Sequence, residues 1–386
     1  MMDILCISTT DWDEIWGSRQ QIMLRFAGSG HRVLFIERQV SIEHLFRDPV
    51  LFRRKLTRWR DAPLKESSPN LWIWHPSLMI PGRYYSMLLN HLGQHLLVTQ
   101  VLPILQALEF SQPILWLYPP HSAPLLHRFN ESCSIYHCID RFAGNQIGLK
   151  HTIIENQEKR LLQNVDIVFT HSKGLQEKYA CYTQRPIKLI PSAADIAHFQ
   201  STSEIHQDIQ LIPHPRIGIM GTFDGRLDTE LLETLITQYP EWHFVFIGQI
   251  RPGRTNLDRL LQWPNVHYLG ARPYQELPML LNGMDIFLIP YRLNELTQFI
   301  NPLKLYEYLA VGKPIISVPL PEVMALSPHV NIADRSNFAD LILRALVSDT
   351  PESQQTRREA AKQHNWDDRI QEIQLTINEF FSRECI

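Results

Sequence analysis

The chain has 386 residues, of which 44% are hydrophobic, and a net charge of −3 at pH 7. This composition is typical of a globular protein and excludes an overall charge that would attract nucleic acid. The length suits two domains of roughly 150–200 residues each. Five scattered cysteines argue against a disulfide framework and for a reducing compartment. We find neither a signal peptide nor a run approaching the roughly 18–20 apolar residues of a membrane span, and we expect a cytoplasmic protein.

Apolar runs of strand length alternate with helical or irregular stretches twice along the chain. They are ILCIST, RVLFIE, LWIWHP, ILWLYP, SIYHCI, IVFTHS and IKLIPS, then RIGIMG, HFVFIG, VHYLG, DIFLIP and PIISV. This alternation predicts an α/β fold with two Rossmann-like, doubly wound parallel sheets facing a cleft. A polar, proline-ended stretch predicts a linker at 201–215 between domains at 1–200 and 216–386. We expect the last helix to pack back toward the first domain.

The loop after the first strand leads into a helix at Gly17. This glycine permits close approach of a ligand to the backbone, and Arg19 adds a positive charge. Asp11, Trp12 and Asp13 precede it and are either ligand contacts or parts of a solvated loop.

Residues 46–60, FRDPVLFRRKLTRWR, carry six Arg or Lys against one Asp, with Phe52, Leu56 and Trp59 at helical spacing. A basic amphipathic helix is typical of a segment that docks on an anionic membrane surface. A solvated helix packed on the domain explains the same pattern. Nucleic acid is a further alternative, but no aromatic reading surface accompanies the charges. We predict a peripheral membrane contact here and no nucleic-acid partner.

The strand containing YHCIDR ends close to two titratable side chains. Asp140 begins a loop, where a partly desolvated carboxylate can take the proton of a hydroxyl group. His137 is the rival base, and it faces away from Asp140 unless the strand ends at Cys138. A structural role for Asp140 is the third interpretation. Cys133, His137 and Cys138 lack a second ligand pair, so we predict no metal site.

Two positions in the second half follow predicted strands and can meet a ligand. Gly221 opens a turn into a helix, where backbone amides can face a diphosphate and Arg226 can reach the same charge. A tight β–α connection accounts equally for this glycine. Tyr291 follows a strand-ending proline and either contacts a base or phosphates or plugs the strand end.

The most informative segment is 301–314, NPLKLYEYLAVGKP. Pro302 and Leu303 suit the first turn of a helix, whose free N–H groups and positive dipole end bind phosphate readily. Lys304 adds a point charge, and Glu307, one turn deeper on the same face, can accept from sugar hydroxyls. A solvated Lys–Glu pair on an amphipathic helix is the alternative.

This segment resembles the nucleotide-sugar-binding signature of the GT-B glycosyltransferases of family 4 and its group 1-like relatives, Lys-x-x-Glu-Tyr-x-Ala-x-Gly-x-Pro. The resemblance extends through GIMGTFDGR, WHFVFIG, NVHYLG and DIFLIP and covers nearly all of residues 216–320 in the right order. It implies a GT-B fold with an acceptor-binding N-terminal domain and a nucleotide-sugar-binding C-terminal domain. The donor-binding residues that it implies are Gly17, Gly221, Arg226, Tyr291, Pro302, Leu303, Lys304 and Glu307.

One departure bears on mechanism. Retaining members of the family carry a first glutamate where this chain has Phe299, and Glu295 is four residues too early to replace it. The YHCIDR stretch is similar to the corresponding strand of the inverting xanthan-type glucuronosyltransferases, in which an Asp is the general base. That similarity implies Asp140 as the base, with His137 second.

We therefore predict a metal-independent hexosyl- or glucuronosyltransferase that uses a nucleotide-diphosphate sugar, with a UDP-sugar favoured. The expected acceptor is a glycan or lipid-linked molecule of cell-surface polysaccharide or glycolipid assembly, at the inner face of the plasma membrane. No cofactor is expected, because the nucleotide sugar is a substrate. A sugar-nucleotide epimerase of the same architecture and a non-catalytic partner protein with the same fold are the alternatives.

Overall fold

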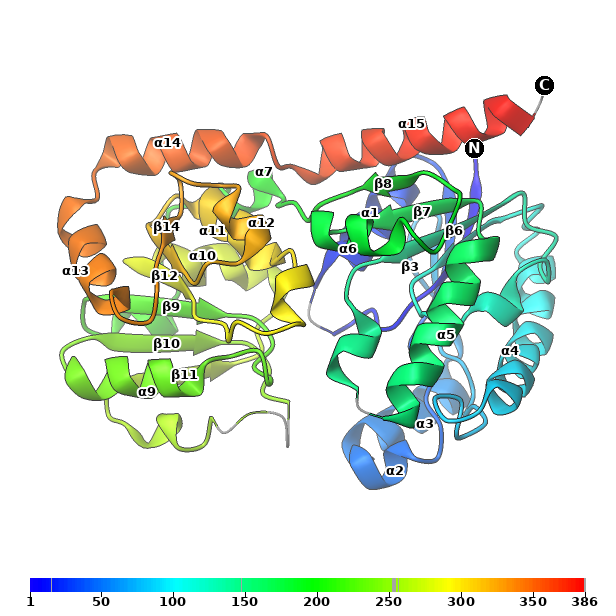
Figure 1. Ribbon diagram of the computed structural model, residues 1–386, viewed down its shortest axis with the longest axis horizontal. Coiled ribbons are helices and arrows are strands. Elements are labelled where there is room, and N and C mark those ends of the chain that lie inside the picture. Colours follow the sequence, from blue (N-terminus) through cyan, green and yellow to red (C-terminus); the bar gives the residue numbers. More distant parts are fainter. Residues whose placement is uncertain (15, 147, 252–254, 256, 385–386) are drawn as a thin grey trace. The chain divides into compact units, whose positions relative to one another are not determined.

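The computed structural model describes residues 1–14, 16–146, 148–251, 255 and 257–384 (Figure 1). They form two compact units, Met1–Pro191 with Ile370–Ile386, and Ser192–Arg369. The first division thus lies at Pro191 rather than at the predicted residue 200. The second lies within helix α15 (Trp366–Glu384), whose residues from Ile370 onward belong to the first unit.

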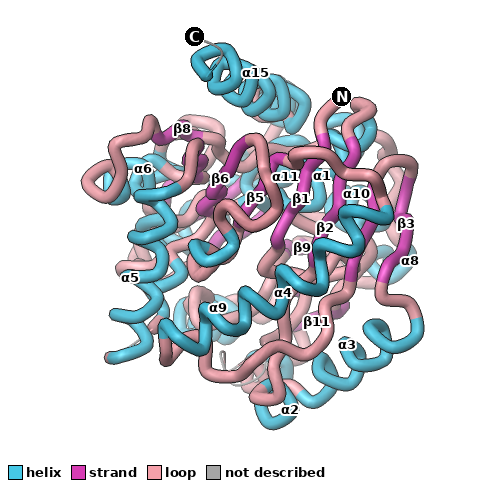
Figure 2. The backbone as a smooth tube through the Cα atoms, turned by 90° about the vertical axis from the view of Figure 1, so that its right-hand side faces the viewer, coloured by secondary structure: helices cyan, strands magenta, loops and turns pink. Residues whose placement is uncertain are grey.

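The first unit is built around an eight-stranded sheet of order β3-β4-β2-β1-β5-β6-β7-β8. All neighbouring strands are parallel except the antiparallel pair β3 and β4. Figure 2 shows β8 and β3 toward opposite sides of this sheet. Its strands are β1 (Asp3–Ile7), β2 (Arg32–Ile36), β3 (Leu64–Ser68), β4 (Leu71–Trp74), β5 (Ile114–Leu117), β6 (Cys133–Cys138), β7 (Ile167–Thr170) and β8 (Ile187–Leu189).

The helices of the first unit connect these strands in the crossovers that parallel pairing requires. The longest, α4, has 21 residues and begins at the cap Ser86, whose side chain accepts from the Leu89 N–H. The helices are α1 (Ser18–Gly28), α2 (His44–Arg47), α3 (Pro49–Asp61), α4 (Met87–Ala107), η1 (Ala123–Leu125), η2 (Phe142–Asn145), α5 (Leu149–Asn164) and α6 (Lys173–Tyr179).

The second unit contains a six-stranded, all-parallel sheet of order β11-β10-β9-β12-β13-β14. Its central strands are fully buried, as expected for a parallel sheet covered on both faces. The strands are β9 (Arg216–Met220), β10 (His243–Ile247), β11 (Val266–Gly270), β12 (Ile286–Ile289), β13 (Ile315–Ser317) and β14 (Asn331–Ile332).

Short and long helices surround this second sheet. They are α7 (Ile196–Phe199), α8 (Gln207–Gln210), α9 (Thr229–Gln238), η3 (Leu260–Gln262), η4 (Tyr274–Glu276), α10 (Leu277–Asn282), η5 (Thr297–Phe299), α11 (Leu303–Val311), α12 (Pro321–Met324), α13 (Phe338–Ser348) and α14 (Pro351–Lys362).

The predicted linker at 201–215 is part of the second unit. Ile209 and Ile212 are buried in the core of that unit. A Cβ atom at Gly283 would lie 2.4 Å from the Ile209 side chain, so the segment packs closely on the end of α10. The segment was predicted as a linker because most of its residues are polar, although its two isoleucines are buried.

All twelve predicted strands are present, and the prediction of an α/β fold with two parallel sheets is confirmed. Two further strands escaped notice. β3 is a polar, largely exposed edge strand, and β14 has only two residues, so neither produces an apolar run. Within the described part of the chain, none of the helices combines the length and apolar character needed to cross a membrane.

Candidate functional site

The candidate site lies where the strand order of the second sheet reverses direction. β9 and β12 are neighbours there, with β10 and β11 on one side and β13 and β14 on the other. Open α/β sheets bind ligands beyond the carboxyl ends of their strands at such a point. Gly221 directly follows β9, and Tyr291 follows β12 after one proline. Two of the predicted donor-binding residues therefore lie at the expected edge of the sheet.

Two glycines bring the backbones after β9 and β10 into direct contact. The Gly221 N–H donates to the Ile247 carbonyl at 2.9 Å. Gly221 has φ +128° and Gly248 has φ +143°, and a Cβ atom at Gly248 would lie 1.8 Å from the Gly221 oxygen. Both positions thus require glycine. Gly248 was not among the predicted site residues, although the glycine that ends HFVFIG was a usable signal.

The ammonium group of Lys304 lies directly over this glycine turn. A Cβ atom at Gly221 would come within 2.6 Å of Lys304 Nζ, so the missing side chain makes room for the cation. Lys304 Nζ also lies 4.9 Å from the centre of the Tyr291 ring. Lys304 forms no ion pair with any residue that the structure describes. The site therefore presents a cation without a carboxylate partner at the carboxyl edge of the sheet.

Tyr291 is 6% exposed and takes part in this arrangement through its hydroxyl as well as its ring. Burial alone would raise the pKa of the phenol. The charges of Lys304 and Arg226 outweigh that effect and lower the pKa, helped by a hydrogen bond with Lys304. Tyr291 thus lies close to two positively charged side chains, Lys304 and Arg226.

Tyr308, the residue after Glu307, holds helix α11 against the sheet. The Met220 N–H donates to the Tyr308 hydroxyl at 2.7 Å, and the Tyr308 ring stacks on Phe287 with centroids 4.0 Å apart. Since Lys304 lies one turn before Tyr308, this contact fixes the position of the ammonium group. Tyr308 was not predicted as a site residue.

The start of α11 differs slightly from the prediction. Pro302 is the N-cap, just outside the helix, and Leu303 is the first helical residue. The helix ends at Gly312, which has φ +89° and donates its N–H to the Tyr308 carbonyl. With nine residues and no side-chain cap, α11 leaves N–H groups of its first turn available to an anion.

Glu307 is deeply buried one turn along the same helix and is 5% exposed. Burial raises the pKa of this carboxyl group to about 8, and the charge of Lys304 opposes the shift only in part. The alternative of a solvated Lys–Glu pair is therefore wrong, because one member is buried. A buried carboxyl group that makes no ion pair with a described residue is a candidate for ligand binding.

Arg226 lies beside Tyr291, but its charge is already matched. Its Nε and Nη2 atoms donate to the two oxygens of Asp224 at 2.9 Å each. Burial alone would raise the pKa of Asp224, but the hydrogen bonds and charge of Arg226 lower it. The guanidinium carbon is 6.0 Å from the centre of the Tyr291 ring. An anion at this position would share Arg226 with Asp224.

Phe299, the residue in place of the first glutamate of the retaining pattern, ends η5 and is half-buried. Its side chain offers no hydrogen-bonding group to a sugar. Glu295 is exposed on the preceding loop.

In the first unit, Gly17 and Arg19 lie at the start of α1, beyond the carboxyl end of β1. Gly17 has φ −147°, which any residue can adopt, and its N–H donates to the Gln20 side chain at 3.2 Å. Arg19 lies over the Tyr118 ring at 5.2 Å. Burial lowers the pKa of Arg19, while Tyr118 and the carboxylate of Asp140 act in the opposite direction. Arg19 and Asp140 are thus close enough to influence each other.

His137 and Asp140 lie in different environments. β6 ends at Cys138, so the strand alternation that would separate them does not extend to Asp140. Asp140 is half-exposed in the loop, whereas His137 is fully buried and stacks on Tyr118 at 5.3 Å. Burial and His171 hold the pKa of His137 well below its usual value. His137 is therefore less accessible to an acceptor than Asp140.

Both ring nitrogens of His137 lack a hydrogen-bond partner among the described residues. Cys133 and Cys138 are buried, and neither forms a disulfide with a described cysteine. Across the described ranges, no group of three or more His, Cys, Asp or Glu side chains is arranged to hold a metal ion.

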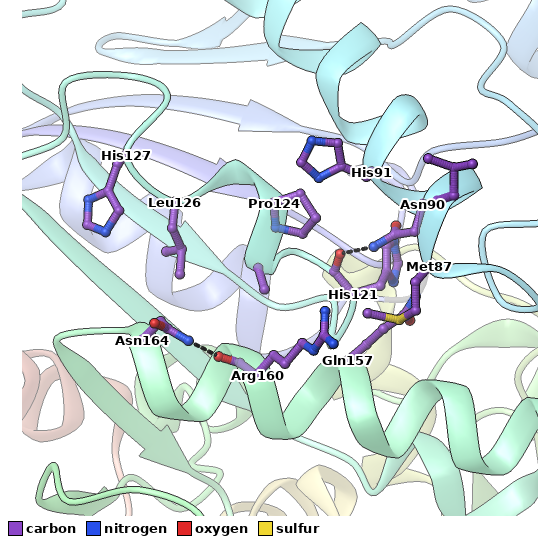
Figure 3. Close-up of a pocket in the computed structure, with 12 residues that line it drawn as sticks. Met87, Asn90, His91, His121, Pro124, Leu126, His127, Gln157, Arg160 and Asn164 are labelled. Carbon is purple, nitrogen blue, oxygen red and sulfur yellow. Dashed lines mark hydrogen bonds between the residues drawn. The ribbon is translucent and has the colours of Figure 1, made fainter.

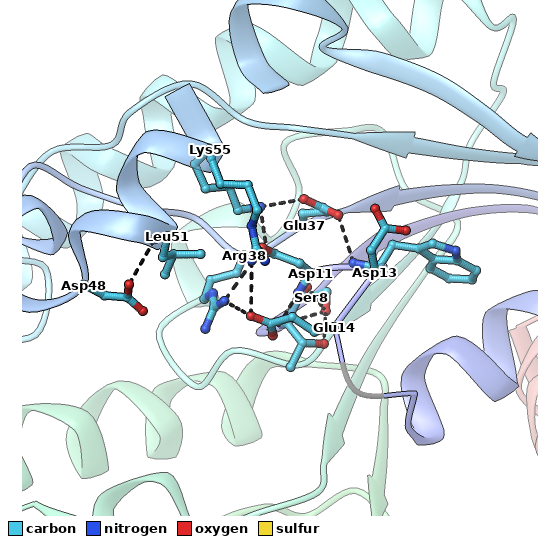
Figure 4. A network of polar contacts seen from close by, with 12 residues as sticks. Ser8, Asp11, Asp13, Glu14, Glu37, Arg38, Asp48, Leu51 and Lys55 are labelled. Atoms are coloured by element: carbon cyan, nitrogen blue, oxygen red, sulfur yellow. Dashed lines mark hydrogen bonds and ion pairs between the residues drawn. The ribbon is translucent and has the colours of Figure 1, made fainter. Parts of the chain in front are cut away.

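The basic segment at 46–60 is tied to the body of the first unit by ion pairs (Figure 4). Lys55 is 2% exposed, and its ammonium group lies 2.6 Å from Asp11 and 2.5 Å from Glu37. Arg54 contacts the same Asp11 at 2.8 Å, and Arg58 contacts Asp13 at 2.9 Å. Three of the six basic residues of the segment are thus paired with acidic residues distant in the chain.

These contacts change the interpretation of the loop that contains Asp11 and of the basic segment at 46–60. Asp11 is fully buried in an ion-pair network, so it belongs neither to a solvated loop nor to an open ligand surface. Burial alone would raise the pKa of Glu37, but His75 and Lys55 lower it to about 2. Phe52 is buried, whereas Leu56 and Trp59 are about 40% exposed. The structure therefore does not support a membrane contact made by the basic residues of α3.

Comparison with known proteins identifies the architecture. Residues 225–348, which include Arg226, Tyr291 and α11, match the model of the family described as "Glycosyl transferases group 1". The chain resembles sucrose-phosphate synthase from Thermosynechococcus elongatus with a TM-score of 0.73 and 18% identity, covering 99% of this chain and 100% of that one. It also resembles Anabaena HepE, solved with UDP and glucose, with a TM-score of 0.68 and 14% identity, covering 98% and 100%. The fold is GT-B, and the predicted resemblance to group 1 glycosyltransferases is confirmed.

A sequence relative is named as a teichuronic acid biosynthesis glycosyltransferase, TuaH, of Bacillus subtilis (strain 168). It is 26% identical over 233 residues, which are 56% of this chain. The match spans 58% of that relative's length. The predicted similarity to the xanthan-type branch stays a prediction.

Proposed function

We propose that the protein is a glycosyltransferase that uses a nucleotide-diphosphate sugar, most simply a UDP-sugar. The observation that carries this proposal is the Lys304 ammonium group, which has no carboxylate partner among the described residues and lies over the Gly221 turn, beside the first turn of α11. A diphosphate there meets a cation, free N–H groups and the positive end of a helix dipole. These groups stabilise the charge that develops on the departing diphosphate and make a metal ion unnecessary. HepE, with UDP in its solved structure, supports UDP as the leaving group.

The other predicted donor contacts complete this site. Glu307 receives hydroxyl groups of the ribose, and Tyr291 holds Lys304 in place. Arg226 contacts the diphosphate from the side while keeping its bond to Asp224. In the first unit, Asp140 is the general base that deprotonates the acceptor, with inversion of configuration at the anomeric carbon. Gly17, also in the first unit, contacts the donor phosphates, and Arg19 adds a positive charge beside it.

Replacing Lys304 by alanine is expected to weaken UDP binding about 10- to 100-fold, because a charge-assisted contact to phosphate contributes roughly 1.5–3 kcal/mol. Titration calorimetry with UDP measures the effect. Lys313→Ala removes another lysine just beyond the same helix and is the matched control, with affinity expected to stay at the wild-type value. Equal UDP affinity in the Lys304→Ala variant and the wild type would remove the diphosphate site from this helix.

The acceptor half of the proposal places the enzyme in cell-surface polysaccharide or glycolipid assembly, on the cytoplasmic face of the membrane. The name of the teichuronic acid relative supports this assignment. Incubation with a panel of nucleotide sugars, with and without membrane lipid extract, tests it. An epimerase would convert a UDP-sugar without any extract, and a non-catalytic partner protein would leave every donor unchanged. Transfer that requires the extract distinguishes the proposed activity from both.

If the enzyme docks on lipid near α2 and α3, exposed apolar side chains make the contact, because Arg54, Lys55 and Arg58 are engaged internally. Phe46 and Val50 are 85% and 78% exposed. Phe46→Ser with Val50→Ser is expected to lower the affinity for phosphatidylserine vesicles, measured by cosedimentation, about 100-fold or more, since each buried apolar side chain contributes about 1.5–3 kcal/mol. Leu211→Ser, at a 91% exposed position of the second unit, is the control. Unchanged sedimentation of the double variant rejects docking through this segment.

A further inference from the structure

The first unit contains a cavity of about 520 Å³ that the proposed donor site and base do not use (Figure 3). It lies between the start of α4, the segment around η1, and α5. Its size is within the range of small-molecule binding sites. None of its twelve lining residues is acidic. Any charge that the cavity presents to a ligand is therefore positive.

The floor of the cavity is polar, buried and incompletely hydrogen-bonded. His121 is 3% exposed and Gln157 is 1% exposed. Neither His121 Nδ1 nor Gln157 Oε1 has a hydrogen-bond partner among the described residues. Buried polar atoms of this kind are normally satisfied, by protein, water or ligand. A carboxamide oxygen accepts hydrogen bonds only, so Gln157 requires a hydroxyl or N–H group.

These floor residues are held in place by hydrogen bonds to other parts of the first unit. The Gln157 amide donates to the Arg83 carbonyl at 3.1 Å. The Asn90 amide donates to the His121 carbonyl at 2.9 Å, joining α4 to the segment before η1. The unpartnered atoms are thus fixed before any ligand arrives, which lowers the cost of binding.

The rim of the cavity supplies hydrogen-bond donors from three separate elements. Arg160 comes from α5, His91 from α4 and His127 from the segment after η1, as Figure 3 shows. All three are exposed, and Arg160 makes no ion pair with a residue described in the structure. His127 has φ +61°, a conformation that costs energy in a non-glycine residue and is found preferentially at functional sites. Donors from three directions suit a tetrahedral phosphate better than a planar carboxylate.

We propose that this cavity binds a phosphorylated sugar, with a sugar hydroxyl on Gln157 and His121 and the phosphate at Arg160, His91 and His127. This inference rests on the proposed glycosyltransferase function in one respect, because it takes the sugar phosphate to be part of the acceptor. Leu88, Pro124 and Leu126 also line the cavity, and apolar side chains of this kind suit an alkyl group esterified to the phosphate. A free sugar phosphate and a lipid-linked one share the recognised chemistry.

Calorimetry with glucose 1-phosphate at low salt tests the cavity directly, without any assay of transfer. The wild type is expected to bind glucose 1-phosphate about tenfold more tightly than inorganic phosphate, because only the former brings hydroxyl groups to the floor. Arg160→Gln is expected to weaken glucose 1-phosphate binding about tenfold or more. Arg128→Gln, an exposed arginine next to His127 that does not line the cavity, is the control and should bind like the wild type.

The decyl ester of glucose 1-phosphate distinguishes the two sources. Tighter binding of the ester supports a lipid-linked ligand, and equal binding supports a free sugar phosphate. Absence of glucose 1-phosphate binding, equal affinity for inorganic phosphate, or an Arg160→Gln variant that binds like the wild type overturns the proposal. UDP is titrated into the same samples. A protein that binds UDP but not glucose 1-phosphate refutes only the cavity, and the reverse result refutes only the donor site.

Discussion

Asp140→Asn is expected to lower turnover by about 100- to 10,000-fold, the usual contribution of a positioned general base. Asparagine keeps the size and much of the hydrogen bonding of the carboxylate but cannot accept a proton. The measurement is transfer from the active nucleotide sugar to membrane lipid extract. UDP affinity is expected to stay unchanged, because Asp140 lies in the first unit and the UDP site in the second.

The structure strengthens the case for Asp140 over His137. Asp140 begins the loop after β6 and is accessible, whereas His137 is enclosed by Tyr118, Trp116 and Phe169. Glu155→Gln, which removes another carboxylate from the same unit, is the control and should retain turnover. NMR of the product gives the second readout, with the anomeric configuration opposite to that of the donor. Retained configuration, or near-normal turnover of Asp140→Asn, rejects Asp140 as the base of an inverting transfer.

The parts of the fold that the sequence predicted correctly depend on local patterns. Each buried parallel strand is a short apolar run, and the glycine and lysine of the donor site follow such runs at fixed distances. β3 was missed because its residues are polar and exposed, and its pairing with β4 produces no pattern within the strand itself. Gly248 was missed because its need for glycine comes from its φ of +143° and from the approach of the Gly221 backbone, which form only in the folded chain.

The errors concern pairings between distant residues. Lys55 meets Asp11 and Glu37 only after the chain has folded, so the segment 46–60 looked like a cationic surface in the sequence. Arg226 was a different case, because its partner Asp224 stands two residues away and the pairing was open to inspection. A run of like charges predicts a binding surface only when no acidic residues elsewhere in the folded chain pair with it.

Glu307→Gln is expected to stabilise the protein at alkaline pH and at the same time to weaken UDP binding. Burial raises the pKa of Glu307 to about 8 in the folded protein, against 4.5 for an ordinary glutamate. The folded state therefore holds this proton more tightly than the unfolded state between these two values. Stability falls as the pH rises from about 4.5 to 8, because unfolding then releases the proton. The total loss is on the order of 5 kcal/mol at most.

Glutamine has nearly the same shape and cannot ionise, so the variant escapes this loss. Its advantage over the wild type should be small near pH 5, grow through neutral pH and level off above pH 8. A change of a few kcal/mol corresponds to roughly 5–10 °C in the melting temperature of the second unit. Thermal unfolding followed by circular dichroism from pH 5 to 9 measures it. Glu241→Gln, an exposed position of the same unit, is the control and should show no such pH dependence.

Binding measurements test whether Glu307, whose ionisation destabilises the unit, also contributes to UDP binding. At pH 9, where Glu307 is ionised, UDP affinity of Glu307→Gln is expected to fall about tenfold, because a carboxylate is the stronger acceptor for ribose hydroxyls. Affinity for pyrophosphate should stay unchanged, since it has no ribose and meets Lys304 and the start of α11. A pH-independent gain in stability would refute the buried, protonated state of Glu307, and equal loss of pyrophosphate binding would refute its contact with the ribose. Binding of the nucleoside is the function that we propose for this carboxyl group, which destabilises its own unit above neutral pH.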